Sequence, residues 1–202
     1  MADSGMSSAR PGDLVVFGGQ EPRQRVIDLR GELSGMAAGL DRVGSMSRID
    51  ECANRVAAAA RRSRRTVAVA ESLTCGQLSS ALGAAPDSAQ WLRGAVVAYS
   101  ADVKRQVLGV PEVPVVSETA ARAMAVGVRA LLGADVAVAV TGVGGPDPQD
   151  GEPAGSVWLA VHAEDGGWAR HELFDGGPED VLRRTVEVAL DMVCEAIGEA
   201  SS

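Results

Sequence analysis

Apolar and polar residues follow two different periods along the chain, and the patterns are clearest from Ser47 onward. Short runs of valine and alanine that end at Gly, Asp or Ser predict buried strands. We expect strands at residues 66–70, 94–99 and 135–140, followed by a hairpin over 156–175 that turns at "EDGG". Apolar positions three and four apart predict helices from Ser47 to about residue 60, over 77–84, through Val107, over 117–133 and from Pro178 through Ile197.

The first of these helices carries clear signals at both ends. Ser47 is placed to cap it, with Asp50 at the third helical position. Its apolar face is formed by Ile49, Cys52, Ala53, Val56 and Ala60. The "RRSRR" segment that follows puts cations at a helix C-terminus, where they interact favourably with the dipole. The alternative is a patch that binds an anionic ligand.

Residues 1–46 are weakly patterned. Ser, Gly and Asp interrupt both a short apolar run, "VVFGG", and an amphipathic segment, "IDLRGELSGMAAGL". We therefore expect a poorly ordered extension here, with Met46 as an alternative translation start.

Strands that alternate with helices predict a layered α/β fold with a largely parallel sheet, which the hairpin makes mixed. Ligands of such sheets bind beyond the carboxyl ends of the strands. Three segments follow predicted strands and are expected to meet there: "ESLTCG", "YSADVK" and "TGVGGPD".

Composition narrows the function classes. Only 3% of residues are aromatic, so the core is expected to consist of Ala, Val and Leu. The net charge of −8 argues against broad binding to a nucleic-acid backbone. The chain has no run of 18 apolar residues, and its first residues, "MADSGMSSARPGD", are polar and contain no apolar signal-peptide segment, so neither a membrane span nor a signal peptide is expected. Three widely spaced cysteines predict neither a disulfide framework nor a zinc site, and we expect a reducing cytoplasm.

Ser72 directly follows the first predicted strand and precedes a helix. Backbone N–H groups at such a helix start hold an anion or a developing oxyanion. The alternative is that Ser72 or Thr74 only caps the helix. Glu71 fits either a polar contact in a site or an ordinary strand end.

Lys104 is the only lysine among 19 basic residues, and Tyr99, five positions earlier, is the only tyrosine. A lysine accepts the proton of a serine nucleophile when its pKa is lowered by burial or by nearby positive charge, which arginine cannot do. His162 and His171 fall in the hairpin, so a Ser–His–Asp triad is not expected. The alternatives are a lysine on a solvated helix face and a half-buried strand tyrosine.

The segment "TGVGGPDP" follows the strand at 135–140. Its glycines let the backbone approach a ligand, and successive N–H groups form a nest for phosphate. It matches neither a Walker A loop nor a GxGxxG motif. The alternative is a flexible surface turn. In "PDPQDGE", Asp147, Asp150 and Glu152 indicate a solvated acidic loop rather than a metal site.

In their order and spacing, these motifs resemble the C-terminal domain of the CinA (competence-damage-inducible) family. The segments that carry the resemblance are "AESLTCG" (70–76), "GAVVAYSADVKRQVLGV" (94–110), "VSETAARAMAVGVR" (116–129) and "VAVTGVGGPD" (138–147) with "PAGSVWLAV" (153–161). The resemblance runs from Ile49 to Ile197 and places an amidohydrolase domain at 47–199. It implies a three-layer α/β/α sandwich with a largely parallel, mixed central sheet.

Standalone members of this family are nicotinamide mononucleotide deamidases. The resemblance therefore implies hydrolysis of the nicotinamide amide to nicotinic acid mononucleotide and ammonia, without a metal or cofactor. The family's catalytic serine and lysine fall on Ser72 and Lys104, with Tyr99 nearby, and we expect N–H groups at the helix start after Cys75 to hold the oxyanion. The expected substrate-binding residues are Glu71, Thr74, Cys75, Gly76, Thr141, Gly142, Gly144, Gly145, Pro146 and Asp147.

The chain departs from the family pattern at several positions. Cys75 stands where glycine is common, Glu152 stands where lysine is common, and "GGPED" replaces a Gly-Asp-Arg sequence. A nucleotide- or partner-binding module without turnover is therefore the alternative function. A homo-oligomer is expected by analogy with the family.

Overall fold

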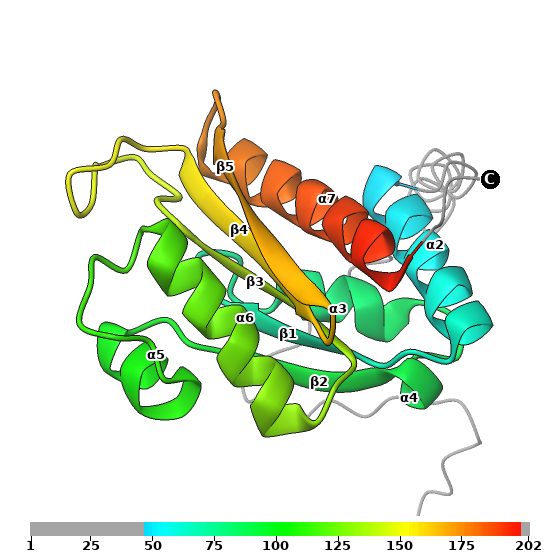
Figure 1. Cartoon of the computed structure of the whole chain (residues 1–202). Helices are drawn as coiled ribbons and strands as arrows, with labels where there is room; N and C mark the ends of the chain where they lie inside the picture. The colour runs from blue at the N-terminus through cyan, green and yellow to red at the C-terminus, as the bar shows by residue number, and fades with distance from the viewer. Residues whose placement is uncertain (1–46, 199–202) are drawn as a thin grey trace, which may run out of the picture. The chain divides into compact units, whose positions relative to one another are not determined.

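A five-stranded mixed sheet forms the centre of the computed structural model, which describes residues 47–198 (Figure 1). The strands are β1 (Val67–Glu71), β2 (Leu92–Val97), β3 (Val136–Gly142), β4 (Ser156–Ala163) and β5 (Gly166–Leu173). They lie in the order β2-β1-β3-β4-β5; β1 pairs in parallel with β2 and β3, and β4 is antiparallel to both its neighbours. The predicted extension at 1–46 and the start at Met46 lie outside the described residues.

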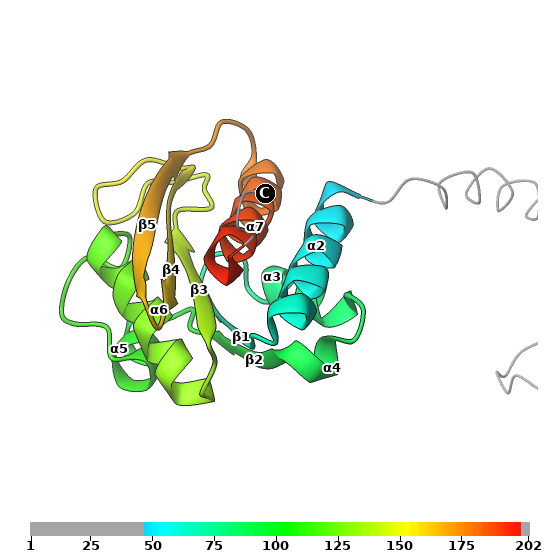
Figure 2. The ribbon, with the colours of Figure 1, turned by 45° about the vertical axis from the view of Figure 1, so that its right-hand side comes forward.

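Helices cover both faces of this sheet. The helices are α2 (Arg48–Ser63), α3 (Gln77–Ala84), α4 (Ser88–Trp91), α5 (Ala101–Leu108), α6 (Glu118–Leu132) and α7 (Pro178–Ile197). Figure 2 shows α5 and α6 on one side of the strands and α2, α3 and α7 on the other. The three-layer α/β/α prediction is confirmed. Within the described residues, no helix is long and apolar enough to cross a membrane.

The alternation of valine and alanine in the parallel strands decides how the two helix layers pack. Val67 and Val69 point into the core under α2 and α7, whereas Ala68 and Ala70 belong to the core beside α6. Because successive strand residues face opposite sides of the sheet, one face of the sheet carries bulky valine side chains and the other carries small alanine side chains. Each buried valine contributes about 1.5–3 kcal/mol through the hydrophobic effect.

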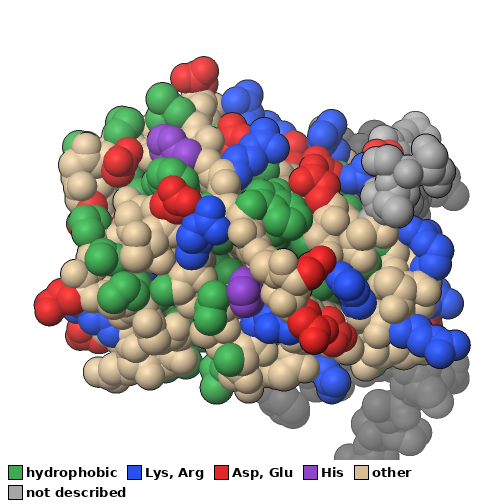
Figure 3. All heavy atoms as spheres, in the orientation of Figure 1, with side chains coloured by type: hydrophobic (Ala, Val, Ile, Leu, Met, Phe, Trp, Pro, Cys, Tyr) green, Lys and Arg blue, Asp and Glu red, His purple; other side chains and the backbone are tan. Residues whose placement is uncertain are grey.

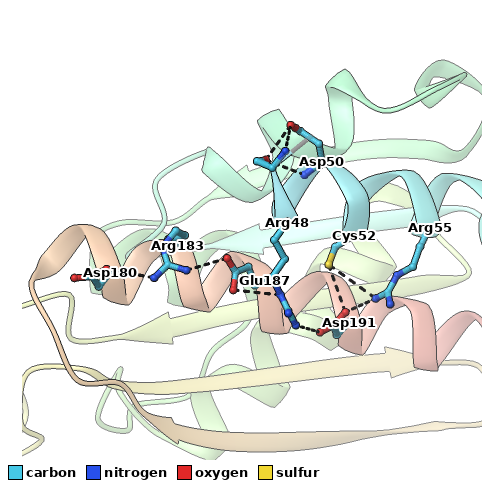
Figure 4. Close-up of polar contacts among 9 residues, drawn as sticks. Arg48, Asp50, Cys52, Arg55, Asp180, Arg183, Glu187 and Asp191 are labelled. Atoms are coloured by element: carbon cyan, nitrogen blue, oxygen red, sulfur yellow. Dashed lines mark hydrogen bonds and ion pairs between the residues drawn. The ribbon is translucent and has the colours of Figure 1, made fainter. Parts of the chain in front are cut away.

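Helices α2 and α7 pack along each other, and polar contacts line their exposed edge (Figure 4). Arg48 lies 3.5 Å from Glu187 and 3.7 Å from Asp191, and Arg55 also pairs with Asp191. Such exposed pairs contribute little, so the buried faces hold the two helices together. Burial is also the main reason that the pKa of Cys52, which lies against α7, is raised.

The helix ends agree closely with the sequence pattern. Ser47 and Asp50 form the predicted capping box, and α7 begins at Pro178 and ends at Ile197 as expected. Ser117 caps α6, and Gly133 ends it in the left-handed conformation.

The expected bounds of the second strand were wrong. It covers Leu92–Val97 rather than 94–99, and it ends early because the Ser100 side chain accepts a hydrogen bond from the Val103 N–H and begins α5. The short helix α4 just before it was not predicted. As a result, Tyr99 lies in the connection between β2 and α5 rather than in a strand.

Candidate active site

The carboxyl ends of β1, β2 and β3 open onto a cavity of about 480 Å³. That volume lies in the range of about 300–1,000 Å³ that is typical of small-molecule sites. The structure brings together nine of the predicted site residues in its lining: Ser72, Tyr99, Lys104, Thr141, Gly142, Gly144, Gly145, Pro146 and Asp147.

Lys104 is buried in the wall of this cavity, on the inner face of α5. Only 1% of its surface is exposed, and its Nζ donates a hydrogen bond to the Tyr99 carbonyl oxygen at 3.2 Å. No carboxylate lies within ion-pair distance of it among residues 47–198. Burial lowers the pKa of Lys104, while the negative charge of Asp150 acts in the opposite direction. A lysine in this setting gives up its proton at a lower pH than an exposed one and can serve as a base.

Ser72 lines the same cavity from the end of β1. Its backbone N–H donates to the Val140 carbonyl oxygen at 3.1 Å, which fixes it against β3. Its side chain is buried, and in the described part of the chain the hydroxyl has no hydrogen-bond partner. The serine is therefore held by its backbone, and its hydroxyl is free to meet a ligand in the cavity.

Tyr99 contacts the lysine through its backbone rather than its ring. The carbonyl oxygen accepts the Lys104 hydrogen bond, while the side chain is 72% exposed at the cavity edge. The alternative of a half-buried strand tyrosine is wrong, because the strand ends at Val97.

Glu71 occupies the helix N-terminus at which we expected an oxyanion site. Its buried carboxylate accepts hydrogen bonds from the Gly76, Leu78 and Ser79 N–H groups at 3.0, 3.1 and 2.9 Å. The Thr74 hydroxyl donates to it as well, at 2.7 Å. The N–H groups after Cys75 are therefore already satisfied.

The structure also decides the alternative that Ser72 or Thr74 only caps helix α3. The N-cap position of α3 is Gly76, in a left-handed conformation and without a side-chain cap, so neither Ser72 nor Thr74 caps it. Between Ser72 and Cys75, the Leu73 and Thr74 N–H groups have no acceptor among the described residues. Leu73 lines the cavity, which makes its N–H the nearest available donor to the Ser72 hydroxyl along the chain.

Cys75 and Gly76 lie away from the cavity that holds Ser72. Both line a separate, shallow hollow together with Ile49 and Gln77. Cys75 has a φ of 46°, in the left-handed region that favours glycine, and its thiol is exposed. The cysteine therefore does not crowd the main cavity.

The connection from β3 to β4 is fastened to the segment before α6 at Val115. The Thr141 hydroxyl donates to the Val115 carbonyl oxygen at 2.6 Å, and the Asp150 carboxylate accepts from the Val115 N–H at 3.1 Å. Glycine is required at position 142, the last residue of β3, since a Cβ there would lie 2.6 Å from the Ser156 carbonyl oxygen. Further along, Gly144 and Gly145 line the cavity, and their N–H groups have no acceptor among residues 47–198.

Glu152 supports this connection from outside the cavity. The Ser156 hydroxyl lies 2.8 Å from the Glu152 carboxylate and 2.8 Å from His171 Nε2. The His171 ring stacks on Trp158, with 4.7 Å between the centroids. These contacts place Glu152 at the base of the connection rather than facing a ligand.

Several lining residues were not predicted from the sequence: Val115, Val116, Gln149, Pro178 and Leu182. The spacing of apolar residues in α7 predicted that Leu182 lies in the core. The residue is only partly buried, because it faces the cavity. No sequence signal separates these residues from ordinary loop and core positions.

In the described residues, no group of His, Cys, Asp and Glu side chains gathers in a way that could hold a metal ion.

Comparison with known proteins finds a family model and several relatives that match this chain. The model of the CinA C-terminal domain matches residues 49–197. A CinA-like protein of Gemmatimonas aurantiaca is 41% identical over 137 residues, which are 65% of this chain and 32% of that relative. The chain thus matches about a third of the length of such relatives. The nicotinamide-nucleotide amidohydrolase PncC of Pseudomonas putida is 40% identical over 152 residues, which are 72% of this chain and 95% of that protein.

Solved structures agree with this grouping. The crystal structure of the competence damage-inducible protein A of Klebsiella pneumoniae has a TM-score of 0.72 and 35% identity, and the match covers 76% of this chain and 99% of that one. A CinA superfamily protein of Escherichia coli has a TM-score of 0.71 and 32% identity, covering 73% of this chain and 90% of that one.

Proposed function

Since the chain belongs to the CinA C-terminal domain family, we propose that it hydrolyses the carboxamide of nicotinamide mononucleotide to nicotinic acid mononucleotide and ammonia. One observation carries the proposal: a buried lysine with a lowered pKa lines the same cavity as a serine whose hydroxyl is unpaired among the described residues. The similarity to PncC, whose length is almost fully matched, supports the choice of substrate.

The proposed chemistry uses Ser72 as the nucleophile and Lys104 as the base. The neutral amine of Lys104 takes the proton of the Ser72 hydroxyl as its oxygen attacks the carboxamide carbon. The Lys104 ammonium then protonates the amide nitrogen, the C–N bond breaks, and ammonia leaves an ester on Ser72. Water, deprotonated by Lys104, attacks this ester, and the proton returns to the Ser72 oxygen as the acid is released.

The other cavity groups suit the substrate's charges. The Leu73 N–H is the donor that we assign to the developing oxyanion, in place of the α3 N–H groups that Glu71 occupies. The Gly144 and Gly145 N–H groups suit the phosphate. The Asp147 carboxylate, on the exposed rim, complements the positive charge of the pyridinium ring.

The first test measures ammonia and nicotinic acid mononucleotide after incubation with nicotinamide mononucleotide. Free nicotinamide and the dinucleotide serve as competing candidate substrates. Ser72→Ala is expected to lose at least about a thousandfold in kcat, because no other group replaces the nucleophile. Ser80→Ala removes an exposed serine that lies outside the main cavity and should leave kcat unchanged.

Two results would contradict this account in different ways. A wild-type rate in Ser72→Ala would exclude that serine as the nucleophile. Binding of the mononucleotide in a calorimetric titration, without any ammonia, would favour the alternative of a binding module without turnover.

A further inference from the structure

A second cavity, of about 690 Å³, lies at the opposite end of β1 from Ser72. It is lined by Thr66, which immediately precedes β1, and by four arginines: Arg61, Arg62, Arg64 and Arg65. Because β1 has five residues at about 3.3 Å each, roughly 17 Å of strand separates the two cavities. Figure 3 shows basic side chains gathered at the lower right, over the C-terminal end of α2.

The arginines of this cavity are only partly neutralised. Arg61 pairs with Asp87 at 2.7 Å, and Arg65 donates to the Ala196 carbonyl oxygen at 3.2 Å. Asp135 lies nearby and accepts hydrogen bonds from Thr66. Arg62 and Arg64 are exposed and have no acidic partner in the part of the chain that the structure describes. A chain with a net charge of −8 thus concentrates unpaired positive charge at one hollow.

Capping of α2 does not account for these arginines. The Ser63 hydroxyl donates to the Ala59 and Ala60 carbonyl oxygens at 2.9 and 3.3 Å. The Arg64 and Arg65 backbone N–H groups satisfy the Arg61 and Ala60 carbonyl oxygens. The helix end is therefore closed by backbone and serine groups, and the Arg62 and Arg64 guanidinium groups remain available for another partner.

We propose that this cavity binds a small anion that carries two or more phosphate groups. Guanidinium groups bind phosphate through paired hydrogen bonds, and several of them surround one hollow here. The lining also includes apolar residues, the exposed Ala58 and the buried Ala60 and Trp91, and the Gln90 amide adds a neutral polar group. The site is concave and of small-molecule size, and the overall negative charge disfavours a nucleic acid.

The test is a calorimetric titration of the full chain with tripolyphosphate and, separately, with orthophosphate. Tripolyphosphate is expected to bind one per chain and more tightly than orthophosphate. The Arg62→Gln/Arg64→Asn variant should weaken that binding at least about tenfold, because two charged forks are lost. Asparagine is chosen at position 64 because this residue has a φ of 55°, which asparagine tolerates well.

A matched control separates the cavity from the net charge of the protein. Arg122→Gln/Arg170→Gln removes two exposed arginines from α6 and β5 and should leave the affinity unchanged. Circular dichroism confirms that both variants fold. The proposal is overturned if tripolyphosphate does not bind, if the cavity variant binds it as tightly as the wild type, or if both variants lose affinity equally. None of these outcomes depends on the proposed amidase activity.

Discussion

The ammonium of Lys104 would lose nearly all of its hydration in the folded chain. Within the described residues, its only hydrogen bond goes to the Tyr99 carbonyl oxygen. Burial therefore favours the neutral amine, whereas the Asp150 carboxylate favours the charged form. The balance between these two effects sets the pH at which the proposed base becomes active.

Replacing Asp150 by asparagine tests this balance. Removing its negative charge should lower the pKa of Lys104 further, so the acid limb of the pH profile of kcat/KM moves to lower pH. The asparagine oxygen can still accept the Val115 hydrogen bond, which keeps the loop in place. Asp165→Asn, in the hairpin turn, has the same change in charge and should leave the profile where it is. A limb that stays fixed or moves to higher pH in Asp150→Asn would contradict the assignment.

At the scale of elements, the place of α5 decides where Lys104 lies. Helix α5 packs against α6, where Gly127 has no side chain to separate the two helices. A Cβ at Gly127 would lie 2.1 Å from the Leu108 carbonyl oxygen, at the end of α5. The glycine therefore holds the lysine-bearing helix close to the rest of the fold.

Gly127→Ala should displace α5 and lower the free energy of unfolding by about 1–3 kcal/mol, the usual cost of overpacking. The amidase rate should fall as well, since Lys104 moves with the helix. Gly83→Ala is the matched control, because a Cβ in that helix meets nothing within 4 Å. It should be neutral or stabilise by up to about 1 kcal/mol. Urea unfolding of both variants checks the difference, and equal stabilities would contradict the packing argument.

Elements with strong local signals could be predicted from the sequence. The signals for α6 and α7, their end residues and the spacing of their apolar residues, are local to each helix. The bounds of both helices were therefore predicted to within one residue. The end of β2 was placed two residues late, because "AVVAY" is equally apolar on both sides of the true boundary.

The site itself was only partly predictable. The unusual composition around Lys104 and the family motifs pointed to the residues of one cavity. The use of Glu71 to hold the α3 N–H groups was missed, because a carboxylate that reaches five to eight residues ahead has no distinctive spacing. The contact between Asp150 and Val115, 35 residues apart, likewise depends on the tertiary fold.

At the scale of the whole molecule, the buried lysine costs stability. The pKa of Lys104 is lowered in the folded chain and has its ordinary value in the unfolded chain. At a pH between these two pKa values, the unfolded state binds more protons than the folded state. The stability of the wild type should therefore rise with pH across that window, as the penalty of burying the charge disappears. A protein that kept this residue only for its fold would gain from replacing it.

Lys104→Met measures that cost. The variant should melt about 2 °C or more above the wild type at neutral pH, since even 1 kcal/mol has an effect of that size in a chain of this length. The difference in melting temperature should shrink as the pH rises toward the ordinary lysine pKa, because the penalty of burying the charge then disappears. The other ionisable groups are common to both proteins, so their effects cancel in this comparison. Thermal unfolding of both proteins between neutral and alkaline pH gives the comparison. A difference that does not change with pH would show that Lys104 is not buried at the cost of its charge.

The most direct measurement for the central claim is the rate of ammonia release from nicotinamide mononucleotide by Lys104→Arg. Arginine keeps the positive charge but cannot give up its proton, so the account predicts a loss of at least about a hundredfold in kcat. The reverse exchange on the neighbouring, exposed residue, Arg105→Lys, should leave the rate unchanged. A Lys104→Arg variant that releases ammonia as fast as the wild type would contradict the role of Lys104 as the base.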